Sequence, residues 1–430
     1  MSLKCLLVLA GLAALAVLAY APALSLPFIA DDYGNLLLAR QFGPVASWGA
    51  LAVDPVHRYR PIYLVLTWWI WSVFGIQPAV FYGTSLVLHV LCTWLVFAVG
   101  AWRPIGWRLA GVSAAFFAVY EGHQEAVMWY SAAYEPLMLL FGLTSFVFWI
   151  LWLDPSRGRM WHYAVSLLCF GLALFSKESA VILAPLLLLP AIEATVRSRR
   201  MVIGWLPFAG AAVLFAWSVF AGSGHHPRLD DGSFSWRVPA ALTWLNSYWR
   251  LFWFWGLLGL FFLGVWRARA WWRIAAAGCV WAGLALVPYS FLVYMNRVPS
   301  RHTYLASVGL SWAVGAAVMA MRDRFRISRP WVVPVMALLI VVHNVGYLWT
   351  RKRAQYVERA APTEALIAAT RRTRGPIIVR RFPFPLIVAQ GAVILGAGKT
   401  LDSLIWTPAG GKSTGLDDYE FVASEATISP

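Results

Sequence analysis

Apolar stretches of about twenty residues recur along this chain, and that length is what a helix needs to cross a bilayer. Hydrocarbon offers no hydrogen-bond partners, so a crossing segment must satisfy its backbone within a helix or a closed barrel. Hydrophobic residues make up 60% of the 430 positions and charged residues 13%. Soluble domains do not sustain this pattern. The sequence therefore predicts an all-α polytopic membrane protein.

Eleven stretches are predicted to cross the membrane. A further run over 62–76 is too short to span, and we expect it to be a helix lying in the membrane interface. The first stretch also resembles a cleavable signal peptide, because Lys4 precedes it and Ala21-Pro22-Ala23 follows it, but we favour a retained anchor. The predicted spans are Cys5–Ala23, 78–101, 107–120, 134–153, 160–176, 178–194, 201–221, 247–266, 271–293, 304–321 and 331–349.

Arginine residues orient these spans. With the N-terminus in the cytoplasm, each inner loop is basic, as the positive-inside rule requires. If 62–76 crossed the bilayer, these loops would move outside, so the interfacial placement is preferred. Topology and anionic headgroups thus account for the net charge of +16, and nucleic acid is not an expected partner. The inner-loop arginines include Arg103, Arg108, Arg157, Arg159, Arg197, Arg199, Arg200, Arg267, Arg269, Arg273, Arg322, Arg324, Arg326 and Arg329.

Two domains are expected on this topology. Residues 1–349 form the transmembrane domain, which includes a polar outer loop over 24–77. Residues 350–430 form a small extracytoplasmic α/β domain. Within it, 365–370 is predicted as helix, and the apolar runs 377–379 and 386–395 are predicted as short strands.

Unusual polar residues gather in the predicted outer loops. Arginine and lysine at headgroup depth can hold the phosphate of a lipid carrier, and a carboxylate can take a proton from a hydroxyl group. The candidates for binding or catalysis are Asp31, Asp32, His57, Arg60, His123, Glu125, Lys177, Glu178, Arg301, His302 and Tyr304.

Structural roles are also open for some of these residues. Asp31 and Asp32 are typical of the start of a helix, here expected over 33–41. Lys177 and Glu178 could form an interfacial ion pair. The four cysteines, Cys5, Cys92, Cys169 and Cys279, are isolated in apolar runs and show no metal-ligand spacing. No cofactor is expected to be required, and a divalent metal is not indicated.

Five stretches resemble the GT-C class of glycosyltransferases, and among them the transmembrane and tetratricopeptide-repeat O-mannosyltransferases. They occur in the family's order and cover roughly residues 20–320. No tetratricopeptide repeats follow, since the tail lacks a 34-residue period. The stretches are Asp31-Asp32-Tyr33, Tyr59-Arg60-Pro61, Gly122-His123-Gln124-Glu125-Ala126-Val127, Phe175-Ser176-Lys177-Glu178 and Arg301-His302-Thr303-Tyr304-Leu305-Ala306-Ser307-Val308-Gly309.

The resemblance implies an enzyme that transfers a hexose or pentose from a polyprenyl phosphate to an acceptor hydroxyl, with inversion at the anomeric carbon. One aspartate of the first outer loop would be the base, and we favour Asp32 over Asp31. Arg60, Lys177, Arg301 and His302 would neutralise the leaving phosphate. Glu125 and His123 would shape the sugar or acceptor pocket, with His123 as an alternative proton relay. Glu178 and Tyr304, within these stretches, and His57 in the first outer loop are also expected to bind substrate.

Two other functions are compatible with this pattern. One is a transporter or flippase of lipid-linked sugars, but transporters place ionisable residues near the bilayer midplane, whereas here they lie at one face. The other is a ligase or polymerase of lipid-linked glycans. In each case the protein is expected in the cell membrane, with its N-terminus cytoplasmic and both its active site and C-terminus extracytoplasmic. The acceptor, whether glycan, lipid or protein, is not specified by these residues.

Overall fold

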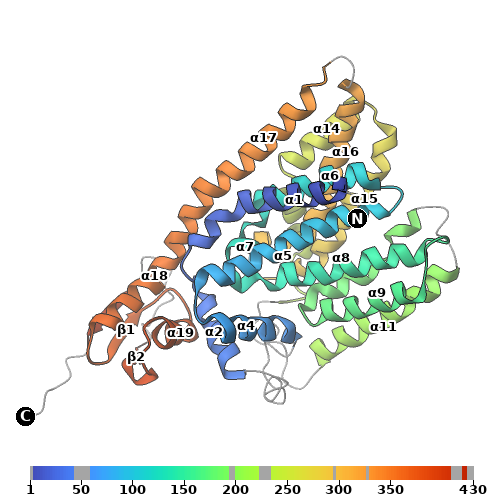
Figure 1. The fold of residues 1–430 in the computed structure, drawn as a ribbon. Coiled ribbons are helices and arrows are strands. Elements are labelled where there is room, and N and C mark those ends of the chain that lie inside the picture. The colour runs from blue at the N-terminus through green and yellow to red at the C-terminus, as the bar shows by residue number, and fades with distance from the viewer. Residues whose placement is uncertain are drawn as a thin grey trace, which may run out of the picture.

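Apolar helices make up most of the protein, which is described here from a computed structural model (Figure 1). The structure describes residues 3–42, 59–192, 199–221, 234–293, 297–325, 329–407 and 419–423. The helices are α1 (Leu3–Tyr20), α2 (Asp31–Phe42), α4 (Pro61–Phe74), α5 (Pro78–Ala98), α6 (Gly106–Val119), α7 (Gln124–Met128), α8 (Tyr134–Leu153), α9 (Met160–Leu174), α10 (Leu183–Leu186), α11 (Arg199–Ala221), α13 (Ala240–Phe252), α14 (Trp255–Val265), α15 (Arg269–Leu286), α16 (Ser307–Phe325), α17 (Val332–Tyr347), α18 (Arg353–Arg372) and α19 (Leu386–Gly391).

Several helices are long and apolar enough to cross a membrane, which agrees with an integral membrane protein. Within the described residues there are six, or seven if the bent pair α13 and α14 is one span. The predicted count of eleven crossings is therefore not confirmed. The six are Leu3–Ser25, Pro78–Ala101, Tyr130–Leu153, Arg199–Ala221, Arg269–Tyr289 and Val332–Arg372.

Two predicted spans are not single helices. Residues 247–266 are divided between α13 and α14, which meet at a bend of 75°, and Phe254 at the break has a φ of 67°. The described part of the predicted span 178–194 forms short turns, Glu178–Ile182, α10 and Leu189–Ile192. Pro185 and Pro190 lie in this segment, and a proline inside a helix removes a backbone donor and clashes with the preceding turn.

Other predicted segments are helical but short. α6 and α9 correspond to the predicted spans 107–120 and 160–176, and they are 14 and 15 residues long. α4, which corresponds to the predicted interfacial segment 62–76, has 14 residues. Each is below the length of about twenty residues that a perpendicular crossing needs.

The C-terminal part combines helices with a small sheet. β1 (Ile377–Arg381) lies between β2 (Leu404–Trp406), which is parallel to it, and β3 (Glu420–Ala423), which is antiparallel. The predicted helix at 365–370 lies within α18, and the predicted strand at 377–379 lies within β1.

The predicted strand over 386–395 is wrong. This segment forms α19 and a π-helical turn, Ala392–Gly396, and its buried residues recur at helical spacing. α19 packs against α2 so closely that a Cβ on Gly391 would lie 2.5 Å from the carbonyl oxygen of Tyr33. A short apolar run does not distinguish a strand from a buried helix, and here the contact with α2 decides.

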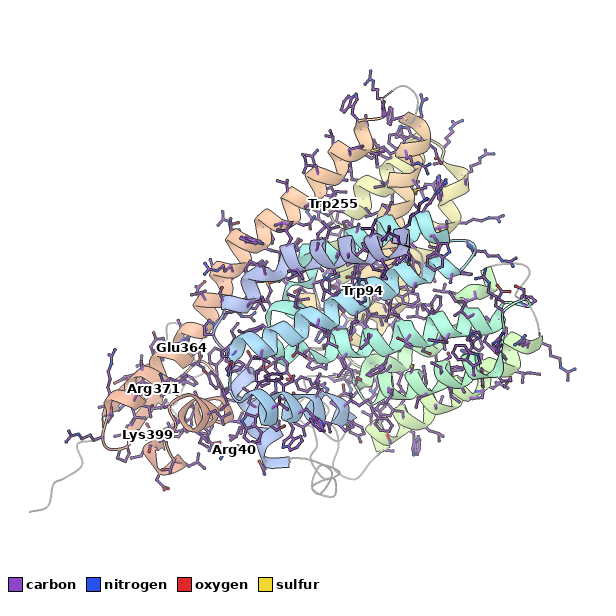
Figure 2. The ribbon with its side chains drawn as sticks, viewed as in Figure 1. Arg40, Trp94, Trp255, Glu364, Arg371 and Lys399 are labelled. Atoms are coloured by element: carbon purple, nitrogen blue, oxygen red, sulfur yellow. The ribbon has the colours of Figure 1, made fainter. Side chains whose placement is uncertain are left out.

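Charged residues mark the end of the molecule that α2 shares with the C-terminal helices. In Figure 2, Arg40 lies at the end of α2, with Glu364, Arg371 and Lys399 in the C-terminal part, while Trp94 and Trp255 lie among the apolar helices.

Small residues allow the closest helix crossing, between α15 and α16. A Cβ on Gly309 would lie 2.1 Å from the carbonyl oxygen of Gly278, and a Cβ on Gly278 would lie 2.4 Å from the carbonyl oxygen of Gly309. Membrane helices associate through this kind of backbone contact because lipid supplies no hydrophobic driving force between them. The loop that precedes α16 contributes two residues to the site described below.

Gly309→Ala should destabilise the protein by about 1–3 kcal/mol, because the added methyl group forces α15 and α16 apart. Gly171→Ala in α9 is the matched control, since a Cβ there would have nothing within 4 Å. Thermal unfolding of the detergent-purified variants measures the difference. Equal melting temperatures for the two variants would contradict the proposed packing.

Candidate functional site

A strained turn comes directly before α2, whose first two residues are Asp31 and Asp32. Ala30 has a φ of 44°, which is uncommon for a residue with a side chain. Asp32 is fully buried and holds this turn. Its Oδ2 accepts hydrogen bonds from the Ile29 N–H at 2.9 Å and the Tyr82 hydroxyl at 3.0 Å. Its Oδ1 accepts from the N–H and the hydroxyl of Ser131 at 2.7 and 2.6 Å.

The neighbouring Asp31 has a different environment. Asp31 is exposed, whereas Asp32 is buried. Burial raises the pKa of Asp32 to about 6, against the lowering effect of its hydrogen bonds. Desolvation by the surrounding protein also raises the pKa of Asp31, and the guanidinium groups of Arg301 and Arg359 oppose this shift. The turn therefore presents one exposed carboxylate beside two positive charges.

These two arginines belong to a cluster around Trp129. Each guanidinium carbon lies 5.2 Å from the centre of the Trp129 ring. Glu125 accepts a hydrogen bond from the Arg301 N–H at 3.1 Å, and its oxygens lie 3.5 Å from Arg301 Nη1 and 3.8 Å from Arg359 Nη1. The Trp129 indole N–H donates to the carbonyl of Ile29 at 3.3 Å. This cluster joins the first and second polar loops to α18.

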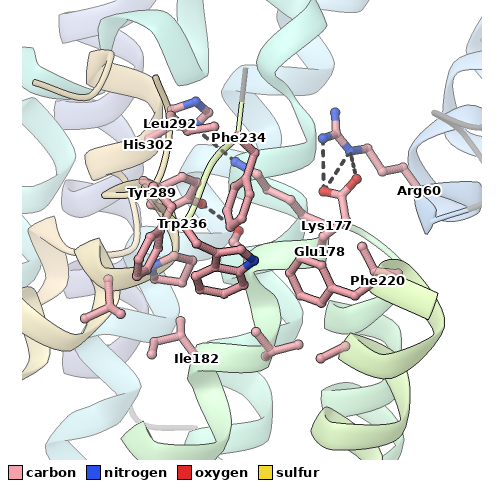
Figure 3. Close-up of a pocket in the computed structure, with 17 residues that line it drawn as sticks. Arg60, Lys177, Glu178, Ile182, Phe220, Phe234, Trp236, Tyr289, Leu292 and His302 are labelled. Carbon is pink, nitrogen blue, oxygen red and sulfur yellow. Dashed lines mark hydrogen bonds and ion pairs between the residues drawn. The ribbon is translucent and has the colours of Figure 1, made fainter. Parts of the chain in front are cut away.

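A cavity of about 480 Å³ opens between α11 and the segment after α15 (Figure 3). Its walls are mainly apolar and aromatic, and its polar residues are gathered in one part of the lining. This volume is in the range of small-molecule sites, which combine apolar walls with a few placed polar groups. The apolar lining includes Ile182, Val219, Phe220, Phe234, Trp236 and Leu292, and the charged or titratable lining consists of Arg60, Lys177, Glu178 and His302.

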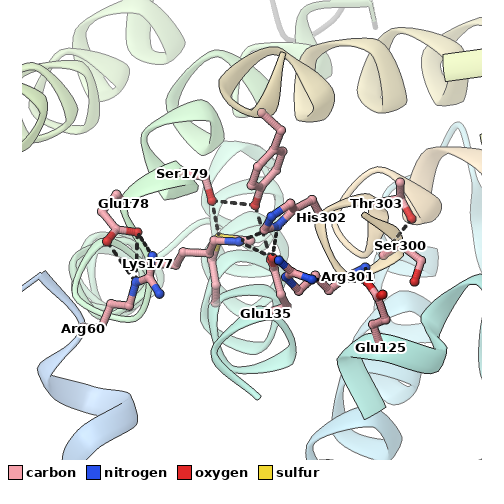
Figure 4. Close-up of polar contacts among 12 residues, drawn as sticks. Arg60, Glu125, Glu135, Lys177, Glu178, Ser179, Ser300, Arg301, His302 and Thr303 are labelled. Atoms are coloured by element: carbon pink, nitrogen blue, oxygen red, sulfur yellow. Dashed lines mark hydrogen bonds and ion pairs between the residues drawn. The ribbon is translucent and has the colours of Figure 1, made fainter. Parts of the chain in front are cut away.

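Lys177 lies at the polar part of this cavity and is paired with a buried carboxylate (Figure 4). Its ammonium group contacts Glu135, and it lies 3.1 Å from Nδ1 of His302. The same His302 nitrogen is 2.7 Å from Glu135 Oε1. Burial lowers the pKa of Lys177 to about 7, although Glu135 raises it. Lys177 can therefore gain or lose a proton near neutral pH.

Tyrosine rings complete this part of the site. The Tyr289 ring stacks on His302 with a centroid distance of 4.4 Å and an interplanar angle of 14°. Its hydroxyl donates to Glu135 Oε2 at 3.3 Å and lies 2.6 Å from the hydroxyl of Ser179. Lys177 Nζ lies 4.5 Å from the centre of the Tyr289 ring. These contacts fix the ring of His302 at the cavity wall.

Arg60 forms a two-pronged ion pair with Glu178. Its Nε lies 2.9 Å and 3.1 Å from the two carboxylate oxygens, and its Nη2 lies 3.0 Å from Oε2. The guanidinium carbon is also 4.6 Å from the centre of the Tyr134 ring. This fork geometry is the one that arginine uses for carboxylates and phosphates.

The cavity and the aspartate turn adjoin each other. Arg301 belongs to the cluster around Trp129, while His302 lines the cavity, and the two are consecutive in the 3-10 turn Ser300–Thr303. Consecutive Cα atoms are about 3.8 Å apart, so this turn connects the two groups of charges directly. Figure 4 shows both groups around that turn.

The structure divides the predicted site residues into three sets. Arg60, Lys177, Glu178 and His302 come together at the cavity, and Asp31, Glu125 and Arg301 lie in the neighbouring cluster. His123 and Tyr304 are buried in the core, where their ring centres are 4.6 Å apart and His123 Nε2 lies 2.6 Å from the Ser307 hydroxyl. His57 lies outside the described residues.

Burial in the core affects the protonation of His123. It lowers the pKa of His123 well below the usual value, which favours a neutral ring. The ring packs against Phe117 at a centroid distance of 4.3 Å. Neither His123 nor Tyr304 is among the residues that line the cavity.

Two residues at the site were not identified from the sequence. Glu135 was placed inside the predicted span 134–153 without a role, although a lone acid in an apolar helix is a sign of a functional or paired group. Arg359 lies in α18, far along the chain, and no local pattern connects it to Glu125.

Among the residues that the structure describes, no cluster of three or more His, Cys, Asp or Glu side chains could hold a metal ion. The expectation that no cofactor is required therefore stays a prediction.

Comparison with solved structures identifies the fold. The structure of ArnT from Cupriavidus metallidurans bound to undecaprenyl phosphate matches with a TM-score of 0.56 and 13% identity, over 91% of this chain and 85% of that one. The archaeal oligosaccharyltransferase AglB from Archaeoglobus fulgidus, in complex with an inhibitory peptide and a dolichol-phosphate, matches with a TM-score of 0.54 and 15% identity. That match covers 86% of this chain, which spans 58% of the length of the oligosaccharyltransferase.

Both similar structures have the GT-C fold, so the fold that the sequence motifs implied is confirmed. At identities this low, the likeness concerns the fold. No protein-family model matches the chain, and neither does any curated protein sequence.

Asp32→Asn should lower the stability by about 1–3 kcal/mol, because an amide nitrogen would face donors that the carboxylate now satisfies. Asp31→Asn is the control and should leave the melting temperature nearly unchanged, since Asp31 is exposed. Thermal unfolding of the purified proteins tests this difference. A larger loss of stability in Asp31→Asn would contradict the assignment of Asp32 as the residue that holds the turn.

Proposed function

We propose that this protein is a membrane glycosyltransferase that uses a sugar linked to a polyprenyl phosphate. The cavity described above is the main support for this proposal. Its apolar wall suits an isoprenyl chain, and Arg60, Lys177 and His302 at its polar part suit a phosphate group. The two similar structures contain a dolichol-phosphate and an undecaprenyl phosphate, which supports a donor of this class.

Asp31 is the proposed general base. Two features support it over Asp32, which the sequence had favoured. The oxygens of Asp32 accept four hydrogen bonds inside the protein, whereas Asp31 is exposed. The positive φ of Ala30 and the contacts of Asp32 hold the turn that presents Asp31. Backbone strain of this kind often persists where it serves a site. Asp32 is thus proposed as a positioning residue.

The reaction is a displacement at the anomeric carbon. Asp31 takes the proton of the acceptor hydroxyl as its oxygen forms the new bond to that carbon. The bond between the carbon and the phosphate oxygen breaks, and the phosphate leaves with the electron pair. Arg60, Lys177 and His302 stabilise the charge that develops on the phosphate. One displacement of this kind inverts the anomeric carbon.

Glu125, Arg301 and Arg359 are proposed to form the acceptor side. Both arginines act on the carboxylate of Asp31 and pair with Glu125, so the three residues connect α7, the turn before α16 and α18. The two guanidinium groups favour the ionised form of Asp31, which the base requires. We place this face, and the C-terminal part with it, outside the cytoplasm, because the basic inner loops orient the spans in that way.

Asp31→Asn should reduce transfer by about 10²–10⁴-fold, the contribution that a general base commonly makes. Membranes that contain the protein are incubated with radiolabelled polyprenyl-phosphate sugars, and covalent transfer of label to an acceptor is measured. Asp154→Asn is the control, because Asp154 pairs with Arg103 and Arg157 outside this site. Full activity of Asp31→Asn would overturn its role, and flipping of the lipid without transfer of label would favour a transporter.

The pH dependence of the same reaction provides a second readout. The pKa of Asp31 is raised by desolvation, and the base acts only when ionised. The value of kcat/KM should therefore fall with decreasing pH at a higher pH than an unperturbed aspartate would give.

A further inference from the structure

Glu178 is the acidic residue among the described residues that line the cavity, and it lies where an anionic ligand would bind. A phosphate needs positive charge, yet Glu178 occupies the fork of Arg60 with both of its oxygens (Figure 3). A carboxylate beside a phosphate is repelled by it, so Glu178 needs an explanation that the proposed chemistry does not supply.

The two carboxylates of this region, Glu135 and Glu178, differ in their surroundings. Glu135 has a side chain with 0% exposure and contacts Lys177, His302 and Tyr289. The side chains of Glu178 and Arg60 are 17% and 11% exposed, and both line the cavity. Glu135 is therefore fixed behind the cationic groups, whereas Glu178 lines the cavity itself.

The bond that Glu178 makes is the bond that a phosphate would make. Arginine presents five N–H donors in a planar fork, and carboxylate and phosphate oxygens bind this fork in the same two-pronged manner. The pair uses Nε and Nη2 of Arg60. Glu178 also follows Lys177 directly in the chain, and both residues line the cavity.

We propose that Glu178 is an internal competitor for the lipid phosphate, an inference that rests on the proposed function. Glu178 binds the guanidinium group of Arg60 while no phosphate is bound, and the phosphate of the donor then replaces it there. After transfer, Glu178 binds the guanidinium group of Arg60 again, which helps to release the polyprenyl phosphate. Glu178 thereby limits the affinity of the cavity and keeps the product from remaining bound.

The test measures binding of undecaprenyl phosphate to the purified full-length protein, with undecaprenol as the phosphate-free control lipid. Glu178→Gln removes the charge but keeps an oxygen that can accept from Arg60. It should bind undecaprenyl phosphate about tenfold more tightly, because like charges a few ångströms apart repel strongly even near the surface. Binding of undecaprenol should not change.

A double-mutant cycle shows whether Glu178 acts through Arg60. Arg60→Gln should weaken binding of undecaprenyl phosphate. In the Arg60→Gln background, Glu178→Gln should have a much smaller effect than in the wild type. Asp154→Asn makes the same change in net charge at an arginine-paired carboxylate outside the cavity, and it should leave binding unchanged.

Two results would overturn this inference. One is unchanged or weaker binding of undecaprenyl phosphate by Glu178→Gln, and the other is an equal effect of Glu178→Gln with and without Arg60. If Glu178→Gln does not fold, Glu178→Asp, whose shorter side chain loosens the fork, should also bind more tightly. A wild-type protein that binds neither lipid would instead overturn the proposed function itself.

Discussion

The carboxylate of Glu135 is the group on which the cavity depends. A lysine taken out of water loses hydration that is worth several kcal/mol, and it stays charged only beside a partner. Glu135 supplies that partner to Lys177 and also contacts His302, while Tyr289 satisfies its second oxygen. Because this network is anchored within α8, two titratable groups can be held at the wall of an otherwise apolar cavity. Burial lowers the pKa of Lys177 to about 7, and the carboxylate of Glu135 opposes this shift.

A second constraint acts on the turn before α2. The two adjacent aspartates look equivalent in the sequence, but they begin α2 after the strained Ala30 with their side chains in different environments. Asp32 is buried with four hydrogen bonds, and Asp31 is exposed beside Arg301 and Arg359. A long helix supplies Arg359, since α17 and α18 form one segment over Val332–Arg372 that runs through the predicted domain boundary at 349. The C-terminal part thus contributes directly to the candidate site.

Much of the fold and part of the site follow from the sequence. Long apolar runs identify helices because hydrocarbon leaves the backbone no other partner, and the polar loops between them identify Arg60, Lys177 and His302. The run 386–395 was predicted as a strand because its local pattern is ambiguous and only its contact with α2 decides. His123 and Arg359 show the same limit. A buried histidine and one that lines a cavity look alike in a sequence, and an ion pair between distant segments leaves no local pattern.

A structure of the protein with undecaprenyl phosphate, determined by electron cryomicroscopy, would show directly whether the phosphate binds at the polar part of the cavity. We expect the phosphate to lie against Lys177 and His302 and to bind the fork of Arg60, with Glu178 turned away and the isoprenyl chain along Phe220 and Trp236. A phosphate bound elsewhere, for example beside Arg108 and Arg322 near the start of α6, would contradict it.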